Sequence, residues 1–198
     1  MKLFYSTASP YARTAQIVLR EVNLDPISIE VQTHPFDNNI EFLKANPLGK
    51  VPCLITDKDD GIFDSEVICQ YLDAEFNQGK LWQPVQSSWA LRTTYSLTSG
   101  LLDLAVARRQ EIMRDGDGLK SDFWWQRFND GLRRGFEELE SRMALMPDGF
   151  NLLDINLACL IDYMAFRHSD LDCIGSQVMS RFQLFQNRPS IKQTQPSD

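Results

Sequence analysis

The sequence predicts an α/β domain followed by an all-α helical-bundle domain. In the first part of the chain, short apolar runs alternate with amphipathic segments in the order strand, helix, strand, helix, strand, strand, helix. After a stretch with turn-forming residues at 77–85, only helical periodicity follows. We therefore expect a first domain at 1–78, a linker at 79–86 and a helical domain at 87–198.

The first strand, helix and strand are predicted from residues 2–31. Residues 2–6 form a short apolar and aromatic run, which is typical of a buried strand. Pro10 suits the first helical position, and apolar residues then recur at helical spacing until Asn23, where we expect the helix to end. Residues 27–31 alternate apolar and polar side chains, which predicts a strand with one buried face. This succession predicts a parallel unit.

A second group of elements completes the first domain. A short helical segment at 40–44 leads into a turn-rich loop at 46–52. Residues 53–56 and 62–63 flank an Asp-Asp-Gly turn at 59–61, so they predict a β-hairpin. Ser65 then opens a helix with one apolar face.

The helical domain is predicted to surround one buried helix. Amphipathic stretches run over 87–114 and 121–146, and residues 152–166 are apolar nearly all round. The last stretch is therefore expected to be the central helix of the bundle. Asn151 and Asp154 have the spacing of a capping box at its start, which indicates a role in folding.

Composition limits the partners. The chain has 198 residues, of which 43% are hydrophobic and 24% charged, as in a folded soluble protein. Its 20 basic residues are scattered among 27 acidic ones, and the net charge of -7 argues against nucleic acid as a partner. We find neither a signal peptide nor a membrane span, so we expect a cytoplasmic protein without a membrane partner.

The four cysteines point away from metal and redox chemistry. They lie far apart, without a short pair or a histidine cluster, at positions 53, 69, 159 and 173. This spacing supports neither a metal site nor a Cys-x-x-Cys redox pair. We expect reduced, mostly packed thiols, and no metal.

Several short motifs follow one another along the chain. They are Ser9-Pro10-Tyr11-Ala12-Arg13, Asn46-Pro47-Leu48-Gly49-Lys50-Val51-Pro52, Asp64-Ser65-Glu66, Asn151-Leu152-Leu153-Asp154 and Asn187-Arg188-Pro189-Ser190. In this order and spacing the chain resembles the glutathione transferase superfamily. The resemblance implies a thioredoxin-like N-terminal domain that binds glutathione and a helical domain that holds a second substrate. It also implies a homodimer in which the first domain of each subunit meets the helical domain of the other.

The resemblance implies a set of glutathione contacts. On the residues alone, an ordinary trans peptide bond is expected before Pro52, whereas the family has a cis proline there. The Val51 backbone would pair with the cysteinyl backbone of glutathione like an added strand. Asp64 and Ser65 would meet the γ-glutamyl group, although Ser65 also suits a plain helix cap. Lys50 can approach the tripeptide, or it is an ordinary surface residue.

Ser9 is the first candidate for the residue that contacts the glutathione thiol. It precedes the first helix, where a hydroxyl donor and the helix N-terminus would both stabilise a thiolate. Its alternative role is an N-cap before Pro10. Tyr5 is the second candidate, and its alternative role is a strand aromatic on the same face as Leu3.

The resemblance favours a serine-type transferase that adds glutathione to a small electrophile. The loop that holds Ser9 contains no cysteine, which places thiol-disulfide exchange in doubt. Two alternatives stay open: a non-catalytic glutathione-binding or regulatory protein, and a glutathione-dependent peroxidase. Candidates for the wall of the electrophile pocket, or else for core or dimer contacts, are Tyr95, Leu102, Arg108, Arg109, Met113, Trp124 and Trp125. We assign no role to His34 or His168.

Overall fold

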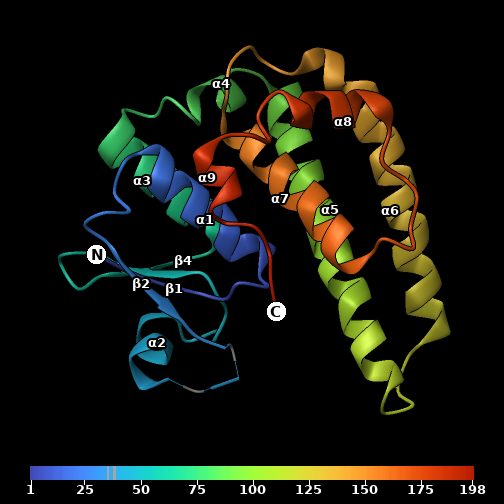
Figure 1. Cartoon of the computed structure of the whole chain (residues 1–198), viewed down its shortest axis with the longest axis horizontal. Coiled ribbons are helices and arrows are strands. Elements are labelled where there is room, and N and C mark those ends of the chain that lie inside the picture. The colour runs from blue at the N-terminus through green and yellow to red at the C-terminus, as the bar shows by residue number, and fades with distance from the viewer. Residues whose placement is uncertain (35, 38) are drawn as a thin grey trace. The chain divides into compact units, whose positions relative to one another are not determined.

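The structure is a computed structural model that describes residues 1–34, 36–37 and 39–198. These residues group into two compact units (Figure 1). The first unit contains Met1–Gln83 and Arg188–Asp198, and the second contains Pro84–Asn187. The first holds a mixed sheet with helices and the second is helical, so the predicted fold class is confirmed.

The first unit is built on a sheet with the strand order β2-β1-β3-β4. The strands are β1 (Lys2–Tyr5), β2 (Ile29–Gln32), β3 (Cys53–Ile55) and β4 (Gly61–Phe63). β1 pairs with β2 in parallel, and it pairs with β3 in antiparallel orientation. β3 and β4 form an antiparallel hairpin. The predicted parallel unit and the predicted hairpin are both confirmed.

The buried face predicted for residues 27–31 is wrong for its first half. Ile27 is 72% exposed and Ile29 is 60% exposed, whereas Val31 packs against the apolar cluster around Phe4. The strand begins at Ile29, so Ile27 precedes the sheet. β2 is also the edge strand, and side chains at the end of an edge strand have few neighbours that could cover them.

Helices cover both faces of this sheet. They are α1 (Pro10–Glu21), α2 (Ile40–Ala45) and α3 (Ser65–Asn77). Figure 1 shows α1 and α3 on one face and α2 on the other. α1 ends as predicted, because Asn23 has a positive φ of 58° and the Leu24 N–H bonds back to the Leu19 carbonyl at 2.9 Å. This is a Schellman end, in which a left-handed residue lets the chain satisfy the last carbonyls.

The C-terminal segment packs on α1. It contains α9 (Pro189–Lys192), and Arg188 forms an ion pair with Glu21 of α1, Nη2 to Oε2, at 2.6 Å. Arg13, which is buried on α1, donates to the Ile191 carbonyl at 3.2 Å. Residues 188–198 therefore belong to the first unit, whereas the sequence analysis assigned them to the second domain. The domain limits at 1–78, 79–86 and 87–198 otherwise stay a prediction.

The second unit is a helical bundle around α7. Its elements are the end of α4 (Gln83–Gln86), α5 (Trp89–Asp115), α6 (Asp122–Arg142), the 3-10 turn η1 (Met143–Leu145), α7 (Leu152–Arg167) and α8 (Ser176–Gln183). Every residue from 152 to 161 is buried, as expected for a central helix. None of the helices described is long and apolar enough to cross a membrane.

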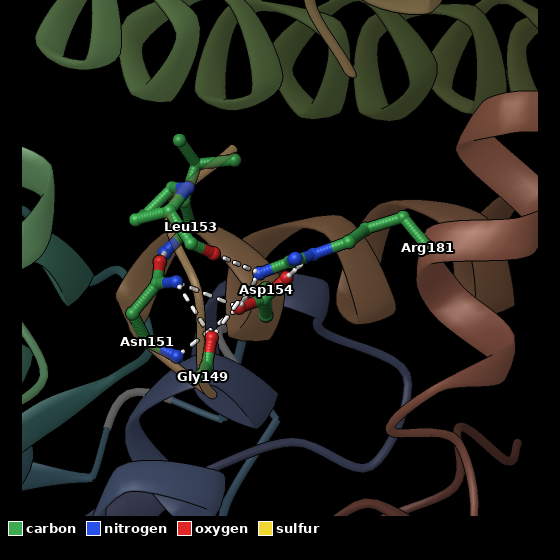
Figure 2. A network of polar contacts seen from close by, with 6 residues as sticks. Gly149, Asn151, Leu153, Asp154 and Arg181 are labelled. Atoms are coloured by element: carbon green, nitrogen blue, oxygen red, sulfur yellow. Dashed lines mark hydrogen bonds and ion pairs between the residues drawn. The ribbon is translucent and has the colours of Figure 1, made fainter. Parts of the chain in front are cut away.

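The buried start of α7 is satisfied by a capping box and an arginine (Figure 2). The Asn151 side chain accepts from the Leu153 N–H at 2.9 Å, and the Asn151 N–H donates to Asp154 Oδ2 at 3.1 Å. The predicted capping box is therefore confirmed. Arg181, from α8, adds bonds to both Asp154 oxygens at 2.6 and 2.9 Å. It also donates to the Gly149 carbonyl at 3.1 Å, so it joins α8 to the turn before α7.

A second buried network surrounds Arg108 on α5, which is only 1% exposed. Its guanidinium donates to Asn129 Oδ1 at 2.7 Å and to Asp170 Oδ2 at 2.5 Å. It also lies 4.2 Å from the ring centroid of Trp125. The buried charge is thus compensated by a carboxylate, an amide and an aromatic face.

His168 completes this network in one tautomer. Its Nδ1 lies 2.7 Å from Arg108 Nη1, and its Nε2 lies 2.8 Å from the Ala105 carbonyl oxygen. Since a guanidinium can only donate, Nδ1 must accept and Nε2 must carry the proton. Burial lowers the pKa of His168 below its ordinary 6.5; the bond to Ala105 and the Asp170 carboxylate oppose this, while Arg108 and Arg109 reinforce it.

Replacement of Asp154 by alanine is expected to lower the free energy of unfolding by about 3 kcal/mol or more, because it leaves the Arg181 charge without its buried partner. Glu138→Ala is the control, since Glu138 pairs with Arg142 on the exposed side of α6. An exposed pair of this kind contributes about 0.5 kcal/mol. Urea unfolding at one protein concentration measures both losses. Equal losses in the two variants would contradict the role assigned to Asp154.

Stability should also depend on the neutral state of His168. Because its folded pKa is lowered, the unfolded chain binds a proton more readily, and this part of the stability is lost as the pH falls below about 6.5. Compared with His168→Gln, the wild type should therefore lose more stability between pH 7 and pH 5. His34→Gln, which alters an exposed histidine, is the control and should follow the wild type. Parallel pH curves for wild type and His168→Gln would contradict the prediction.

Candidate functional site

Three connecting segments leave the sheet of the first unit on the same side, where β1 and β4 end and β3 begins; we call this side the sheet edge. Phe4 pairs with Cys53, and Cys53 pairs with Phe63. The residues that follow Phe4, precede Cys53 and follow Phe63 therefore emerge side by side. These connections carry the predicted site residues, which are Tyr5, Ser9, Lys50, Val51, Pro52, Asp64 and Ser65.

Ser9 lies at the start of α1, in the first of these connections. It is the N-cap, and its Oγ accepts from the Ala12 N–H at 3.2 Å. A hydroxyl group can donate one proton and accept at two lone pairs. In the half-buried Ser9, the cap uses only a lone pair of the oxygen. The N-cap role is confirmed, and it leaves the hydroxyl proton available to a ligand.

Tyr5, at the end of β1, is half-buried. Its ring packs against an apolar cluster that includes Phe4, Phe42 and Cys53, as expected of a strand aromatic, but Leu3, whose face it was expected to share, does not belong to this cluster. Its hydroxyl makes no hydrogen bond with the part of the chain that is described. Tyr5 therefore remains able to donate to a ligand as well.

The second connection holds the predicted cis proline. The Val51–Pro52 bond is cis, as the resemblance implies. The Val51 side chain is buried in the apolar cluster, but its N–H and C=O form no hydrogen bond with another described residue. Lys50 is exposed and has no ion pair within the described residues. The unpaired N–H and C=O of Val51, next to the start of the internal strand β3, can pair with an extended chain.

The third connection enters α3 through a strained residue. Asp64 has a φ of 73° and a ψ of 129°, although it is not glycine, and its Oδ1 accepts from the Glu66 N–H at 2.9 Å. Such backbone strain is concentrated at functional sites. Asp64 is therefore the N-cap, and the alternative prediction that Ser65 caps this helix is wrong.

Ser65 is instead the first helical residue of α3. It is half-buried, and its hydroxyl makes no hydrogen bond with the described residues. A helix N-terminus with a spare hydroxyl is a suitable contact for a carboxylate.

One residue that supports this edge was missed by the sequence analysis. Asn46 follows α2, and its buried side-chain amide bonds to the Leu48 N–H and to the Lys50 carbonyl. The signal that could have indicated it is an asparagine before Pro47, because asparagine side chains commonly close turns of this kind.

The three connections together offer hydroxyl groups, the unpaired N–H and C=O of Val51, a carboxylate and a helix N-terminus. This set fits a short extended peptide that carries both an ammonium and a carboxylate. No group of three or more histidine, cysteine or acidic side chains that could hold a metal occurs among the described residues.

Comparisons with known proteins agree with this geometry. Residues 3–80 match the family model of the glutathione S-transferase N-terminal domain. A solved glutathione transferase family member from Pseudomonas fluorescens Pf-5, with bound glutathione, has a TM-score of 0.88 and 28% identity over 100% of this chain and 99% of its own. The first unit therefore contains a glutathione S-transferase N-terminal domain, the thioredoxin-like domain of that fold. The whole chain shares its fold with this solved glutathione transferase.

Two further proteins are similar to this chain over most of its length. A glutathione S-transferase from Methylobacillus flagellatus KT, with glutathione bound, has a TM-score of 0.86 and 27% identity over 99% of both chains. An uncharacterized GST-like protein of Escherichia coli K12, YibF, is 29% identical over 171 residues, 84% of this chain and 83% of its own.

The pocket-wall candidates on the helical unit fall into three groups by burial. Tyr95, Leu102 and Arg108 are buried within the bundle, so their side chains have structural roles in this glutathione S-transferase fold. Met113 and Trp124 are exposed on α5 and α6. Trp125 and Arg109 are half-buried, and Trp125 is engaged by Arg108 and Lys120.

Most cysteines of this chain are packed in its interior. Cys53, Cys69 and Cys159 are buried, Cys173 is half-buried, and all four are free thiols. Burial raises the pKa of Cys53 to about 11 although it lies directly after Pro52. It therefore cannot serve as a nucleophile at neutral pH.

Proposed function

We propose that this chain is a glutathione transferase that binds glutathione at the shared sheet edge and adds its thiolate to a small electrophile. The main support is the register of Phe4, Cys53 and Phe63, which gathers a hydroxyl, the unpaired N–H and C=O of Val51 and an acid-serine pair at one edge. Solved relatives with 27% and 28% identity hold glutathione, which makes glutathione the expected occupant.

Glutathione would bind as a short added strand. The N–H and C=O of Val51, next to Pro52, would pair with the cysteinyl backbone. Asp64 would accept from the γ-glutamyl ammonium, and Ser65 with the N-terminus of α3 would donate to the γ-glutamyl carboxylate. Lys50, which is exposed beside Val51, would pair with a carboxylate of the tripeptide.

Ser9 would activate glutathione by donating a hydrogen bond that stabilises its thiolate. A free thiol with a pKa of about 8.5 is only a few per cent ionised at neutral pH. A decrease of about two pKa units requires roughly 2.7 kcal/mol of preferential stabilisation of the anion. A hydrogen bond to a charged group contributes about 1.5–3 kcal/mol, and the N-terminus of α1 adds to it.

The reaction would form one bond at sulfur. The thiolate attacks the electrophilic carbon, the S–C bond takes its electron pair from sulfur, and the leaving group or the acceptor π-system receives the displaced pair. The thiol proton goes to solvent when the thiolate forms. The reaction class would be detoxifying conjugation, with glutathione as co-substrate.

Replacement of Ser9 by alanine should raise the pKa of bound glutathione by about one to two units, while glutathione affinity changes little. Calorimetric titration measures the affinity, and the thiolate absorbance against pH measures the pKa. Ser88→Ala is the matched control, because Ser88 caps α5 through its Oγ at the same 3.2 Å from a backbone N–H. The Ser88→Ala variant should lose about 1 kcal/mol of unfolding free energy, as expected for a missing N-cap, without a change in the pKa of the bound thiol.

Other outcomes would change the activating residue or the proposed function. If Ser9→Ala keeps the low thiol pKa and Tyr5→Phe raises it, Tyr5 is the activating residue. Tight binding without a lowered pKa or any transfer would indicate a non-catalytic glutathione-binding protein. Reduction of a hydroperoxide would indicate a peroxidase. A wild type that binds no glutathione would refute the proposal.

The same proposal includes a cytoplasmic location. Four free thiols, of which three are buried, suit a compartment that keeps cysteines reduced. The net charge of -7 argues against an anionic membrane surface or nucleic acid as a partner.

A homodimer is the expected assembly. In the first unit, Phe63 and Val67 leave apolar surface exposed at the start of α3. In the second unit, α5 and α6 form a mostly apolar groove, lined by Thr93, Ser96, Leu97, Gly100, Leu101, Leu104, Gly131 and Gly135. Exposed apolar surfaces of this kind commonly mark subunit interfaces.

A charge at Val67 should therefore dissociate the dimer. Light scattering after gel filtration is expected to give twice the subunit mass of 22.8 kDa for the wild type and about one subunit mass for Val67→Glu. Ile27→Glu is the control, because it introduces the same charge at an exposed apolar residue in the turn before β2. A wild type that elutes as a monomer would refute the dimer.

A further inference from the structure

We propose that Asn46 is a positioning residue for glutathione, which acts through the peptide group between Lys50 and Val51. This inference rests on the proposed function, because it assigns to Asn46 the orientation of the backbone that would receive the cysteinyl part. Asn46 itself would not touch the ligand, since its side chain is buried beneath the loop.

The backbone and the side chain of Asn46 both form hydrogen bonds within the segment 42–50. It is 1% exposed, and its N–H donates to the Phe42 carbonyl of α2 at 2.8 Å. Its Oδ1 accepts from the Leu48 N–H at 3.0 Å, and its Nδ2 donates to the Lys50 carbonyl at 2.7 Å. Its own carbonyl accepts from the Gly49 N–H at 3.0 Å. One side chain therefore ties the end of α2 to the last carbonyl before Val51.

The planarity of the peptide group transmits this bond to Val51. The Lys50 carbonyl and the Val51 N–H belong to one trans peptide plane, in which the two groups point in opposite directions. When the Asn46 amide holds the carbonyl inward at 2.7 Å, the Val51 N–H is turned away from the buried amide. That N–H has no partner among the described residues, so it is free to donate to a ligand.

No strand pairing provides the same constraint. β3 begins only at Cys53, and within the described residues the Asn46 amide is the hydrogen-bond partner of the Lys50 carbonyl. Gly49, with a φ of 61°, makes the turn between them flexible in the unfolded chain. Without the amide, the ligand would have to order this peptide when it binds, and that cost would lower its affinity.

The test compares Asn46→Ala and Asn46→Asp with Asn39→Ala. Asn46→Asp keeps an acceptor for the Leu48 N–H, but it places a carboxylate oxygen against the Lys50 carbonyl. Asn39 caps the other end of α2, where its Oδ1 accepts from the Phe42 N–H at 3.1 Å. Its loss destabilises the same helix without a change at Lys50. Calorimetry with glutathione gives the Kd, thermal unfolding gives the Tm, and the thiolate absorbance gives the bound thiol pKa.

We expect both Asn46 variants to raise the Kd for glutathione about 10-fold or more, with Asn46→Asp the weaker binder. The pKa of the bound thiol should stay at the wild-type value, because Ser9 is unchanged. Asn39→Ala should keep the Kd within about twofold of wild type even where its Tm falls as far as that of Asn46→Ala.

Three results would overturn the inference: wild-type affinity in Asn46→Ala, an equal loss of affinity in Asn39→Ala at the same Tm, or a thiol pKa that shifts together with the Kd. In each of these cases the wild type binds glutathione, so the proposed function survives. A wild type that binds no glutathione would refute both.

Discussion

The pairing of Phe4, Cys53 and Phe63 across three strands determines where the first unit can hold a ligand. A shift of one residue in this register would turn Phe4 and Cys53 out of their apolar cluster. Burial of these side chains therefore sets the register, and the register sets which connections emerge together. The candidate site thus depends on core packing, although none of its polar groups belongs to the core.

The polar groups of the two units differ in how they are satisfied. In the helical unit, Asp154 and Arg181 form an ion pair at 2.6 Å, and Arg108 has a carboxylate, an amide and an imidazole as partners. Buried charges left without such partners would destabilise the bundle. At the sheet edge, the N–H and C=O of Val51 and the Ser65 hydroxyl have no such partners among the described residues. A ligand can supply what the protein itself leaves unpaired there.

The two asparagines at the ends of α2 have different roles. Asn39 satisfies a helix N-terminus, which is a local task. Asn46 lies one short helix later, and its amide reaches a carbonyl four residues further along the chain. The first contributes to the stability of α2, whereas the second orients the peptide before Pro52. Loops that bind ligands need such side-chain supports, because no strand partner holds their backbone.

The sequence by itself determined the elements that depend on local patterns. The order of strands and helices, the end of α1 at Asn23, the buried helix at 152–166 and the capping box at Asn151 follow from periodicity and short-range hydrogen bonds. The motifs that resemble the glutathione transferase superfamily also indicated where the site residues lie along the chain.

Only the tertiary structure decided the partners that are distant in sequence. It showed that Ile29 lies exposed on an edge strand, that Arg181 joins Asp154, and that Glu21 holds Arg188 against α1. It also made Asp64, not Ser65, the cap of α3, because the chain leaves β4 with a positive φ at Asp64. Such contacts depend on how elements pack, and local patterns in a sequence do not contain that information.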